Sequence, residues 1–124
     1  MNILSIDYGQ KRIGLAWVDT DLGVVLPYGK LETGDWKLEL VKLIKDEKAN
    51  LIVIGLPIGL DGQENNNTGL VRKFVSELEK SVEIPVEFVD ERFTSRQADQ
   101  MGGDVSRDEK SAMLILQSYL DKSN

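Results

Sequence analysis

The chain has 124 residues, a length that suits one domain, which we expect to span residues 1–124. It contains no cysteine and no histidine, which excludes disulfides, thiol nucleophiles, imidazole general bases and zinc sites of the usual kind. The net charge of −6 argues against unspecific adhesion to nucleic-acid backbones, although an acidic site that binds a divalent cation reverses the local charge. Catalysis would therefore use carboxylates, other polar side chains or a hard metal ion held by oxygen ligands.

The sequence carries no recognisable export or membrane signal. Met1 leads directly into an apolar segment without a preceding basic region. No run reaches the roughly 18 apolar residues that a membrane helix needs. We therefore expect a cytoplasmic protein without membrane contact.

Three strands joined by short turns are predicted at the start of the chain. Apolar, β-branched residues over 3–8 and 13–18 flank a turn at 9–12, and a third strand is expected over 24–31. Pro27 in this third strand indicates a sheet edge or an irregularity, because proline has no backbone N–H to donate. The three segments together favour an antiparallel meander.

Helical and extended segments then alternate. Apolar residues at helical spacing predict a helix over 36–47, with Asp35 as its N-cap. The nearly all-apolar segment 51–56 indicates a central parallel strand. The remaining segments are a helix with apolar positions over 70–78, a strand over 85–89, a possible helix over 94–100 and a helix from Ser106 to about Asp121. The main order, β-β-β-α-β-α-β-α, predicts an α/β fold with a mixed sheet and helices on its faces.

Two helix starts carry capping patterns. Ser106 with Glu109 fits a capping box. The polar, glycine- and asparagine-rich loop 57–67 precedes another helix, which Thr68 or an asparagine is expected to cap. This loop is either a plain strand-to-helix connection or a place where a helix N-terminus faces phosphate.

Acidic residues stand at the ends of predicted strands and at the start of the last helix. Asp7 ends the first strand, Asp90 and Glu91 end the last one, and Asp108 begins the helix. Ligands of open α/β sheets gather beyond the carboxyl ends of the strands, so these carboxylates can converge. Each also has a local explanation: a turn for Asp7, a solvated strand end for Asp90 and Glu91, and the helix dipole for Asp108.

Helix phase favours an inward-facing Asp108. One helix face carries four residues at spacings of four, three and four: Asp108, Ala112, Ile115 and Tyr119. A carboxylate on this packed face needs a partner, and a shared cation is one. Converging carboxylates without histidine or cysteine suit Mg²⁺ or Mn²⁺, and a pair of such ions can support phosphodiester hydrolysis.

Basic residues stand near each acid. They are Lys11, Arg12, Arg92, Arg96, Arg107 and Lys110. They either bind phosphate around a metal site or balance charge on a solvated surface.

Four sequence blocks in order resemble one protein family and cover nearly the whole chain. They are IDYGQKRIG at 6–14, IVIGLP at 52–57 followed by Asp61-Gly62, VDERFTS at 89–95, and Asp108 with SAMLILQSYL at 111–120. Together they resemble the YqgF family, also called RuvX-type, of Holliday-junction resolvases and pre-16S rRNA nucleases. Sugar kinases and actin-like ATPases share the opening block, but 124 residues cannot form their two lobes.

The resemblance implies an RNase H-like fold and a Mg²⁺- or Mn²⁺-dependent nuclease that matures the 5′ end of pre-16S rRNA. The implied catalytic, metal-binding acids are Asp7, Glu91 and Asp108, with Asp90 as an alternative or accompanying ligand. The implied substrate-binding residues are Lys11, Arg12, Arg92 and Thr94.

One departure from the family pattern concerns the grip on substrate. The segment 95–107 has thirteen residues and only two basic ones, whereas relatives commonly carry a longer basic loop there. Two alternatives to rRNA processing stay open: resolution of Holliday junctions, which needs two active sites and most simply a homodimer, and nucleic-acid binding without catalysis. Among nucleic acids, pre-16S rRNA is expected as the partner rather than branched DNA, and the ribosomal particle is a further expected partner. The expected assembly is a monomer or a homodimer.

Overall fold

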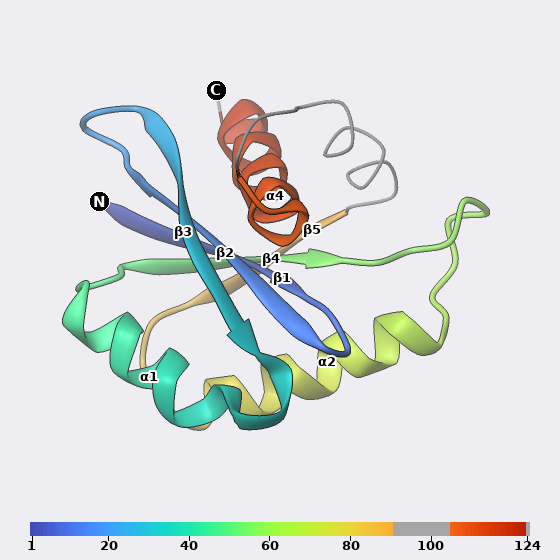
Figure 1. Cartoon of the computed structure of the whole chain (residues 1–124). Helices are drawn as coiled ribbons and strands as arrows, with labels where there is room; N and C mark the ends of the chain where they lie inside the picture. The colour runs from blue at the N-terminus through green and yellow to red at the C-terminus, as the bar shows by residue number, and fades with distance from the viewer. Residues whose placement is uncertain (91–104, 124) are drawn as a thin grey trace.

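A five-stranded mixed sheet forms the centre of the protein (Figure 1). The computed structural model describes residues 1–90 and 105–123. The strands are β1 (Asn2–Tyr8), β2 (Arg12–Asp19), β3 (Val24–Glu32), β4 (Leu51–Leu56) and β5 (Val86–Asp90). Their order in the sheet is β3-β2-β1-β4-β5. The first three pair antiparallel, and β4 runs parallel to both β1 and β5, which confirms the predicted meander and central strand.

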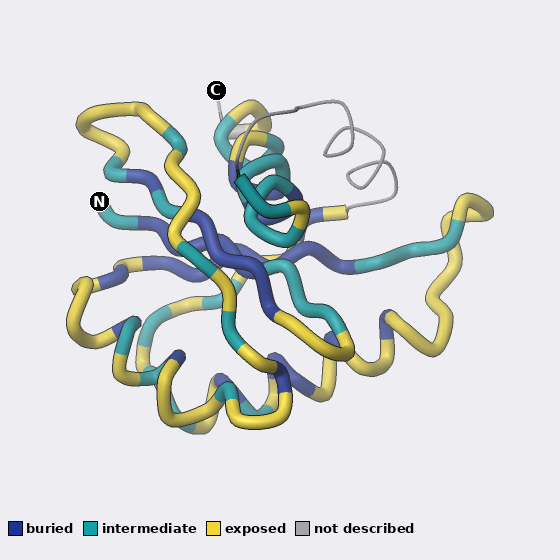
Figure 2. Tube along the Cα trace, in the orientation of Figure 1, coloured by how far each residue is buried: buried dark blue, intermediate teal, exposed yellow. Residues whose placement is uncertain are grey.

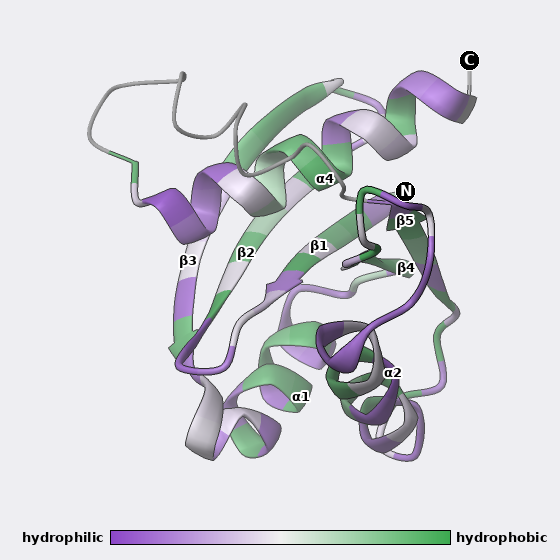
Figure 3. Cartoon of the chain, turned by 90° about the vertical axis from the view of Figure 1, so that its right-hand side faces the viewer, coloured by the Kyte–Doolittle hydropathy of each residue, from purple (hydrophilic) through white to green (hydrophobic). Residues whose placement is uncertain are grey.

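Helices cover both faces of this sheet, as Figures 1 and 3 show from two sides. A short 3-10 helix at Thr33–Asp35 leads into α1 (Trp36–Asp46), and α2 (Asn66–Glu79) lies beside α1 on the same face. The opposite face carries α4 (Arg107–Ser123). The predicted order β-β-β-α-β-α-β-α is thus confirmed. The possible helix over 94–100 lies outside the described residues.

The predicted irregularity at Pro27 is a bulge in the edge strand β3. Leu15 pairs with Gly29 while the next residue, Ala16, pairs with Pro27, so Tyr28 is the extra residue. Gly29 has a φ of 135°, a backbone conformation that residues other than glycine rarely adopt. The bulge therefore lets a proline stand in β3 without breaking the ladder to β2.

Two apolar layers, one on each side of the sheet, form the core. Figure 2 shows that buried residues gather in the central strands. All six residues of β4 are buried, because this strand is covered on both faces. Its alternate residues enter the two layers: Ile52 and Ile54 join the layer with α1 and α2, and Leu51 and Val53 join the layer with α4. Each face of the sheet is thus assigned to a different set of helices.

The predicted helix caps are confirmed at two of the three positions. Asn65 and Thr68 form a capping box at the start of α2. At the start of α4, the Glu109 N–H donates to Ser106 Oγ at 3.3 Å, and the Ser106 hydroxyl donates to the Glu109 carboxylate at 2.9 Å. Asp35 does occupy the N-cap position of α1, but its side chain makes no capping hydrogen bond. Within the part of the chain that the structure describes, no helix is long and apolar enough to cross a membrane.

Candidate active site

The Asp7 side chain lies on the face of the sheet that α4 covers. Side chains alternate along β1, so Ile3, Ser5 and Asp7 share one face. Ile3 packs in the apolar layer with α4, and the Ser5 hydroxyl donates to the Ala112 carbonyl of α4 at 2.6 Å. Asp7 is the next residue on this face, half-buried near the end of the strand. The strand therefore presents its carboxylate beside the start of α4.

Gly14 brings the first turn of α4 against the sheet directly beside Asp7. The two residues are opposite partners in the β1–β2 ladder, and opposite residues point to the same face. A Cβ at Gly14 would lie only 2.0 Å from the backbone oxygen of Asp108, so this approach requires glycine. Asp7 and Asp108, which stand near opposite ends of the chain, are thus brought to one place.

Arg12 lies at this place as well, bound to Asp108. Its Nε donates to the Asp108 Oδ2 at 3.1 Å. The arginine side chain is 53% exposed and the aspartate side chain 31%. An ion pair this exposed contributes about 0–1 kcal/mol, so the Arg12 guanidinium can leave Asp108 at little cost. Lys11, the preceding residue, is exposed in the turn between β1 and β2.

Thr33 binds the turn that carries Lys11 and Arg12 through two hydrogen bonds. The Thr33 N–H donates to the Lys11 carbonyl at 3.0 Å, and its hydroxyl donates to the Gly9 carbonyl at 2.7 Å. Thr33 is buried. The 3-10 helix before α1 thus holds the basic turn in position beside the acids.

Asp90 is not brought to this face. Val89 belongs to the layer under α4, whereas Asp90 pairs with Leu56 of the layer under α1 and α2. Successive residues of a strand face opposite sides, so Asp90 is exposed on the side away from Asp7 and Asp108. The other predicted site residues, Glu91, Arg92 and Thr94, lie outside the described residues.

The residues that converge here fit a hard cation. Asp7 and Asp108 offer only oxygen ligands, the donors that Mg²⁺ and Mn²⁺ prefer. Within residues 1–90 and 105–123, no three acidic side chains lie close enough together to hold a metal ion. The described residues therefore include two of the three carboxylates predicted to hold the ion, and the third, Glu91, lies outside them.

Sequence reasoning missed the residues that bring the acids together. Ser5 is the only polar residue in an otherwise apolar stretch of β1, and Gly14 interrupts the apolar segment of β2. Both are recognisable signals, since a buried serine needs a partner and a glycine within a strand often marks close backbone approach. Neither signal predicts which helix or strand packs against these two residues.

Replacing Ser5 with alanine should lower the free energy of unfolding by about 1 kcal/mol, because the fold loses a buried hydrogen bond between β1 and α4. Urea unfolding followed by circular dichroism measures this. The matched control is Ser76→Ala on the exposed side of α2, which should not lower the midpoint, because alanine has the higher helix propensity and no buried contact is lost. Equal midpoints for the two variants would contradict the role of Ser5 as an anchor of α4.

The sheet order and the two helix layers are those of an RNase H-like fold. The chain is similar to the solved structure of T. thermophilus RuvC in complex with a Holliday junction, with a TM-score of 0.70 and 12% identity over 99% of this chain and 94% of that one. It is also similar to the fowlpox virus Holliday junction resolvase, with a TM-score of 0.59 and 13% identity over 98% of this chain and 99% of that one. At such identities the similarity concerns the fold alone.

Sequence comparison then gives the family. The RuvX family, described as Holliday junction resolvase, matches residues 1–122, and the chain belongs to it. A relative from Maridesulfovibrio salexigens named "Putative pre-16S rRNA nuclease" is 38% identical over 135 residues, covering 99% of this chain and 100% of its own. A relative of the same name from Dictyoglomus thermophilum is 36% identical over 137 residues, covering 100% and 98%.

Proposed function

We propose that this protein is a divalent-metal-dependent nuclease that hydrolyses phosphodiester bonds, and that its task is 5′-end maturation of pre-16S rRNA. The observation that carries the proposal is the placement of Asp7 and Asp108 on one face, beside Gly14 and the basic turn. The names of the relatives support a nuclease, and support rRNA rather than DNA as its substrate.

Asp7, Glu91 and Asp108 are the residues that would hold Mg²⁺ or Mn²⁺. Glu91 is preferred over Asp90 as the third ligand, because Asp90 shares the face of Leu56, away from the other two acids. The bound ion would supply an activated water and would stabilise the leaving oxygen. The two described carboxylates, Asp7 and Asp108, support a location for that chemistry at the end of β1 and the start of α4.

Lys11 and Arg12 are the proposed phosphate-binding residues. Arg12 presents a planar guanidinium that suits two phosphate oxygens, and its present partner Asp108 is a carboxylate of similar geometry. A bound substrate phosphate would replace Asp108 as the partner of Arg12, and the Asp108 carboxylate would then be free to bind the ion. Arg92 and Thr94 remain proposals from the sequence motif.

Cleavage of two substrates side by side tests the proposed function. A 16S rRNA fragment with a 5′ extension and a synthetic four-way DNA junction are incubated with the protein in Mg²⁺, in Mn²⁺ and in EDTA. The expected result is metal-dependent cleavage of the RNA alone. A purified protein that cuts neither substrate in either metal would overturn the nuclease proposal.

Junction resolution is the second candidate, and the description of the RuvX family favours it. Symmetric cleavage of a four-way junction needs two active sites, most simply in a two-fold symmetric dimer. Light scattering across a concentration series decides whether the protein forms one. A strict monomer that leaves junctions intact would remove this candidate.

Replacing Arg12 with glutamine should weaken RNA binding for every sequence, because the variant loses one phosphate contact. We expect the slope of log Kd against log salt to fall by about one. Fluorescence anisotropy with labelled RNA at several salt concentrations measures this slope. Lys122→Gln, which removes the same charge at the far end of α4, is the matched control and should leave the slope unchanged. Identical slopes for both variants would contradict the role of Arg12.

A further inference from the structure

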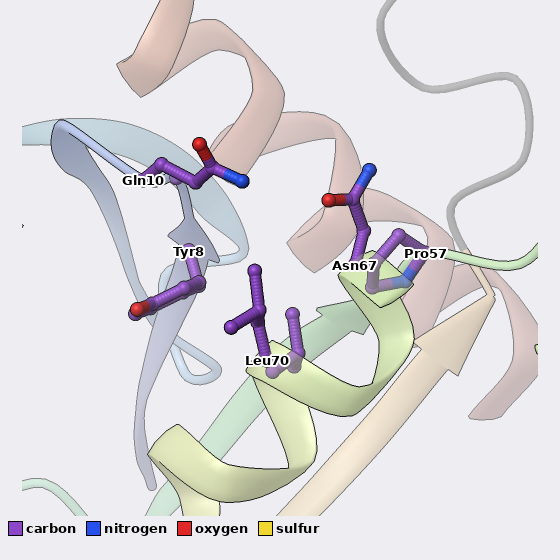
Figure 4. Close-up of a pocket in the computed structure, with 7 residues that line it drawn as sticks. Tyr8, Gln10, Pro57, Asn67 and Leu70 are labelled. Atoms are coloured by element: carbon purple, nitrogen blue, oxygen red, sulfur yellow. The ribbon is translucent and has the colours of Figure 1, made fainter. Parts of the chain in front are cut away.

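A pocket of about 330 Å³ opens at the carboxyl ends of β1 and β4 (Figure 4). Tyr8 and Val71, which line it, belong to the apolar layer with α1 and α2, so the pocket lies on the side of the sheet opposite Asp7. The last residue of β1, the residues that follow β1 and β4 and the first turns of α2 line it. Its main contributors are Tyr8, Gln10, Pro57, Asn67 and Leu70. We propose that this pocket binds one unpaired nucleobase of the strand to be cleaved, an inference that rests on the proposed nuclease function.

The chemistry of the lining selects a neutral ligand group. None of the described residues that line the pocket has an acidic or basic side chain. The N–H groups of Asn67 and Thr68 at the start of α2, which could otherwise bind a phosphate, already donate to Asn65. The charged phosphate donors lie instead in the turn at Lys11 and Arg12. A nucleobase is the neutral part of a nucleotide, and a pocket of this size accommodates it.

Two primary amides stand at the rim of the pocket. Gln10 comes from the turn after β1 and Asn67 from the first turn of α2, and Figure 4 shows their side chains extending toward each other above Leu70. Both residues are exposed. Each amide offers a donor and an acceptor, the combination that pairs with the edge of a base and, for adenine, with N6 and N7 together. The rim can therefore hold a base by its edge.

The floor of the pocket is apolar and firmly held. Leu70 is left 38% exposed there, although leucine gains by burial. The Tyr8 ring packs against Phe74 with centroids 4.7 Å apart, which fixes the orientation of the ring. A flat, apolar face such as that of a base would cover Leu70 and exclude water from it.

The wall formed by α2 and its preceding loop is preorganised. Asn65 Oδ1 accepts from the N–H groups of Asn67 and Thr68, at 3.0 and 3.2 Å. The buried Thr68 hydroxyl also donates to the Pro57 carbonyl, so the end of β4 and the start of α2 are joined. Arg72 holds the same loop through Glu64 with two hydrogen bonds of 2.7 and 2.9 Å, which lowers the pKa of the Glu64 carboxyl. The backbone of Asn67 is therefore held in place before any ligand binds.

The position of the pocket relates it to the acids. Tyr8 follows Asp7 directly, and consecutive Cα atoms lie about 3.8 Å apart, so the pocket and the acidic site lie on two sides of one strand end. A nucleic-acid strand with a phosphate at Asp7 and Asp108 can place a neighbouring base in the pocket only if that base is unstacked and unpaired. The pocket thus selects single-stranded or splayed nucleotides, the form in which proteins usually read RNA bases.

Binding of matched oligonucleotides to a cleavage-deficient protein tests this inference. The background is Asp7→Asn, and the probes are labelled RNAs of nine adenosines and of nine abasic ribose-phosphate units, which carry the same charge. The test variant adds Gln10→Ala and Asn67→Ala, whose side chains line the pocket. The matched control adds Gln63→Ala and Asn66→Ala, which are exposed residues of the same loop and helix that do not line it.

We expect the test variant to bind the adenosine probe about tenfold more weakly and the abasic probe unchanged, because only the former loses base contacts. The control variant should alter neither affinity. Equal losses on both probes, or no loss on either, would overturn the base-binding pocket. Leu70→Ala, which alters the floor of the pocket, is compared in the same way with Leu38→Ala, which alters an exposed leucine elsewhere. Leu70→Ala should weaken binding of the adenosine probe only, and Leu38→Ala should change neither affinity.

Cleavage by the unaltered protein separates this inference from the function on which it rests. If that protein cleaves RNA in Mg²⁺ or Mn²⁺ while the variants show no base-dependent loss, the pocket proposal alone is wrong. If the unaltered protein neither binds nor cleaves any RNA, the proposed function is wrong and the pocket proposal with it.

Discussion

Replacing Asp7 with asparagine should reduce metal-dependent cleavage by at least about a thousandfold, because an amide is a far poorer ligand for Mg²⁺ than a carboxylate. A bound metal ion contributes several kcal/mol of transition-state stabilisation, and each 1.4 kcal/mol corresponds to a factor of ten. Asparagine has nearly the same shape as aspartate, and the position is only half-buried, so the fold should persist. Single-turnover cleavage of labelled RNA measures the loss.

Thermal unfolding provides the control for this variant. In the unaltered protein, Mg²⁺ or Mn²⁺ should raise the unfolding temperature, since an ion that binds only the native state stabilises it. The Asp7→Asn protein should unfold cooperatively but lose most of this increase. Cleavage at the original rate, or an unchanged response to metal, would remove Asp7 from the site.

Replacing Gly14 with alanine should lower the free energy of unfolding by about 3 kcal/mol and reduce cleavage by about a hundredfold or more. The new Cβ would lie 2.0 Å from the Asp108 oxygen and 2.4 Å from its carbonyl carbon, so the backbone of α4 must move away from β2. Overpacking of this kind costs about 1–3 kcal/mol, and a displacement of about 1 Å at a catalytic group costs about a hundredfold in rate. Urea unfolding and cleavage assays measure the two effects.

Gly69→Ala is the matched control for Gly14→Ala. A Cβ at Gly69 meets nothing within 4 Å, and the residue lies in the first half of α2. Alanine should therefore raise the stability by about 1 kcal/mol through its higher helix propensity. If both glycine variants kept full stability and cleavage, the close contact between β2 and α4 would not hold the site together.

Most elements of the fold could be predicted from the sequence because their signals are local. The apolar run 51–56 predicted a buried parallel strand, and β4 occupies these residues between two parallel neighbours. Pro27 predicted an edge or an irregularity, and β3 shows both. The helix phase of Asp108 with Ala112 and Ile115 predicted an inward-facing acid, and this face of α4 packs on the sheet.

The assignment of acids was only partly accessible. The sequence placed Asp90 and Glu91 together at a strand end, and alternation along the strand forbade both from facing the same side. Which of them faces α4 depends on which side of β5 packs against that helix. In the structure, Val89 lies in the layer under α4. Asp90, the next residue along β5, therefore faces the other side of the sheet.

The sequence by itself determined the order of strands and helices, the cap of α4, the residue types that could cap α2 and the types of residue available for catalysis. These properties follow from hydrophobic period, capping patterns and composition, all of which act over a few residues. Only the tertiary structure decided that Gly14 admits Asp108, that Arg12 pairs with it and that Gln10 and Asn67 frame one pocket. Such contacts join segments far apart in the chain, and their geometry depends on how helices pack on the sheet, which no local pattern encodes.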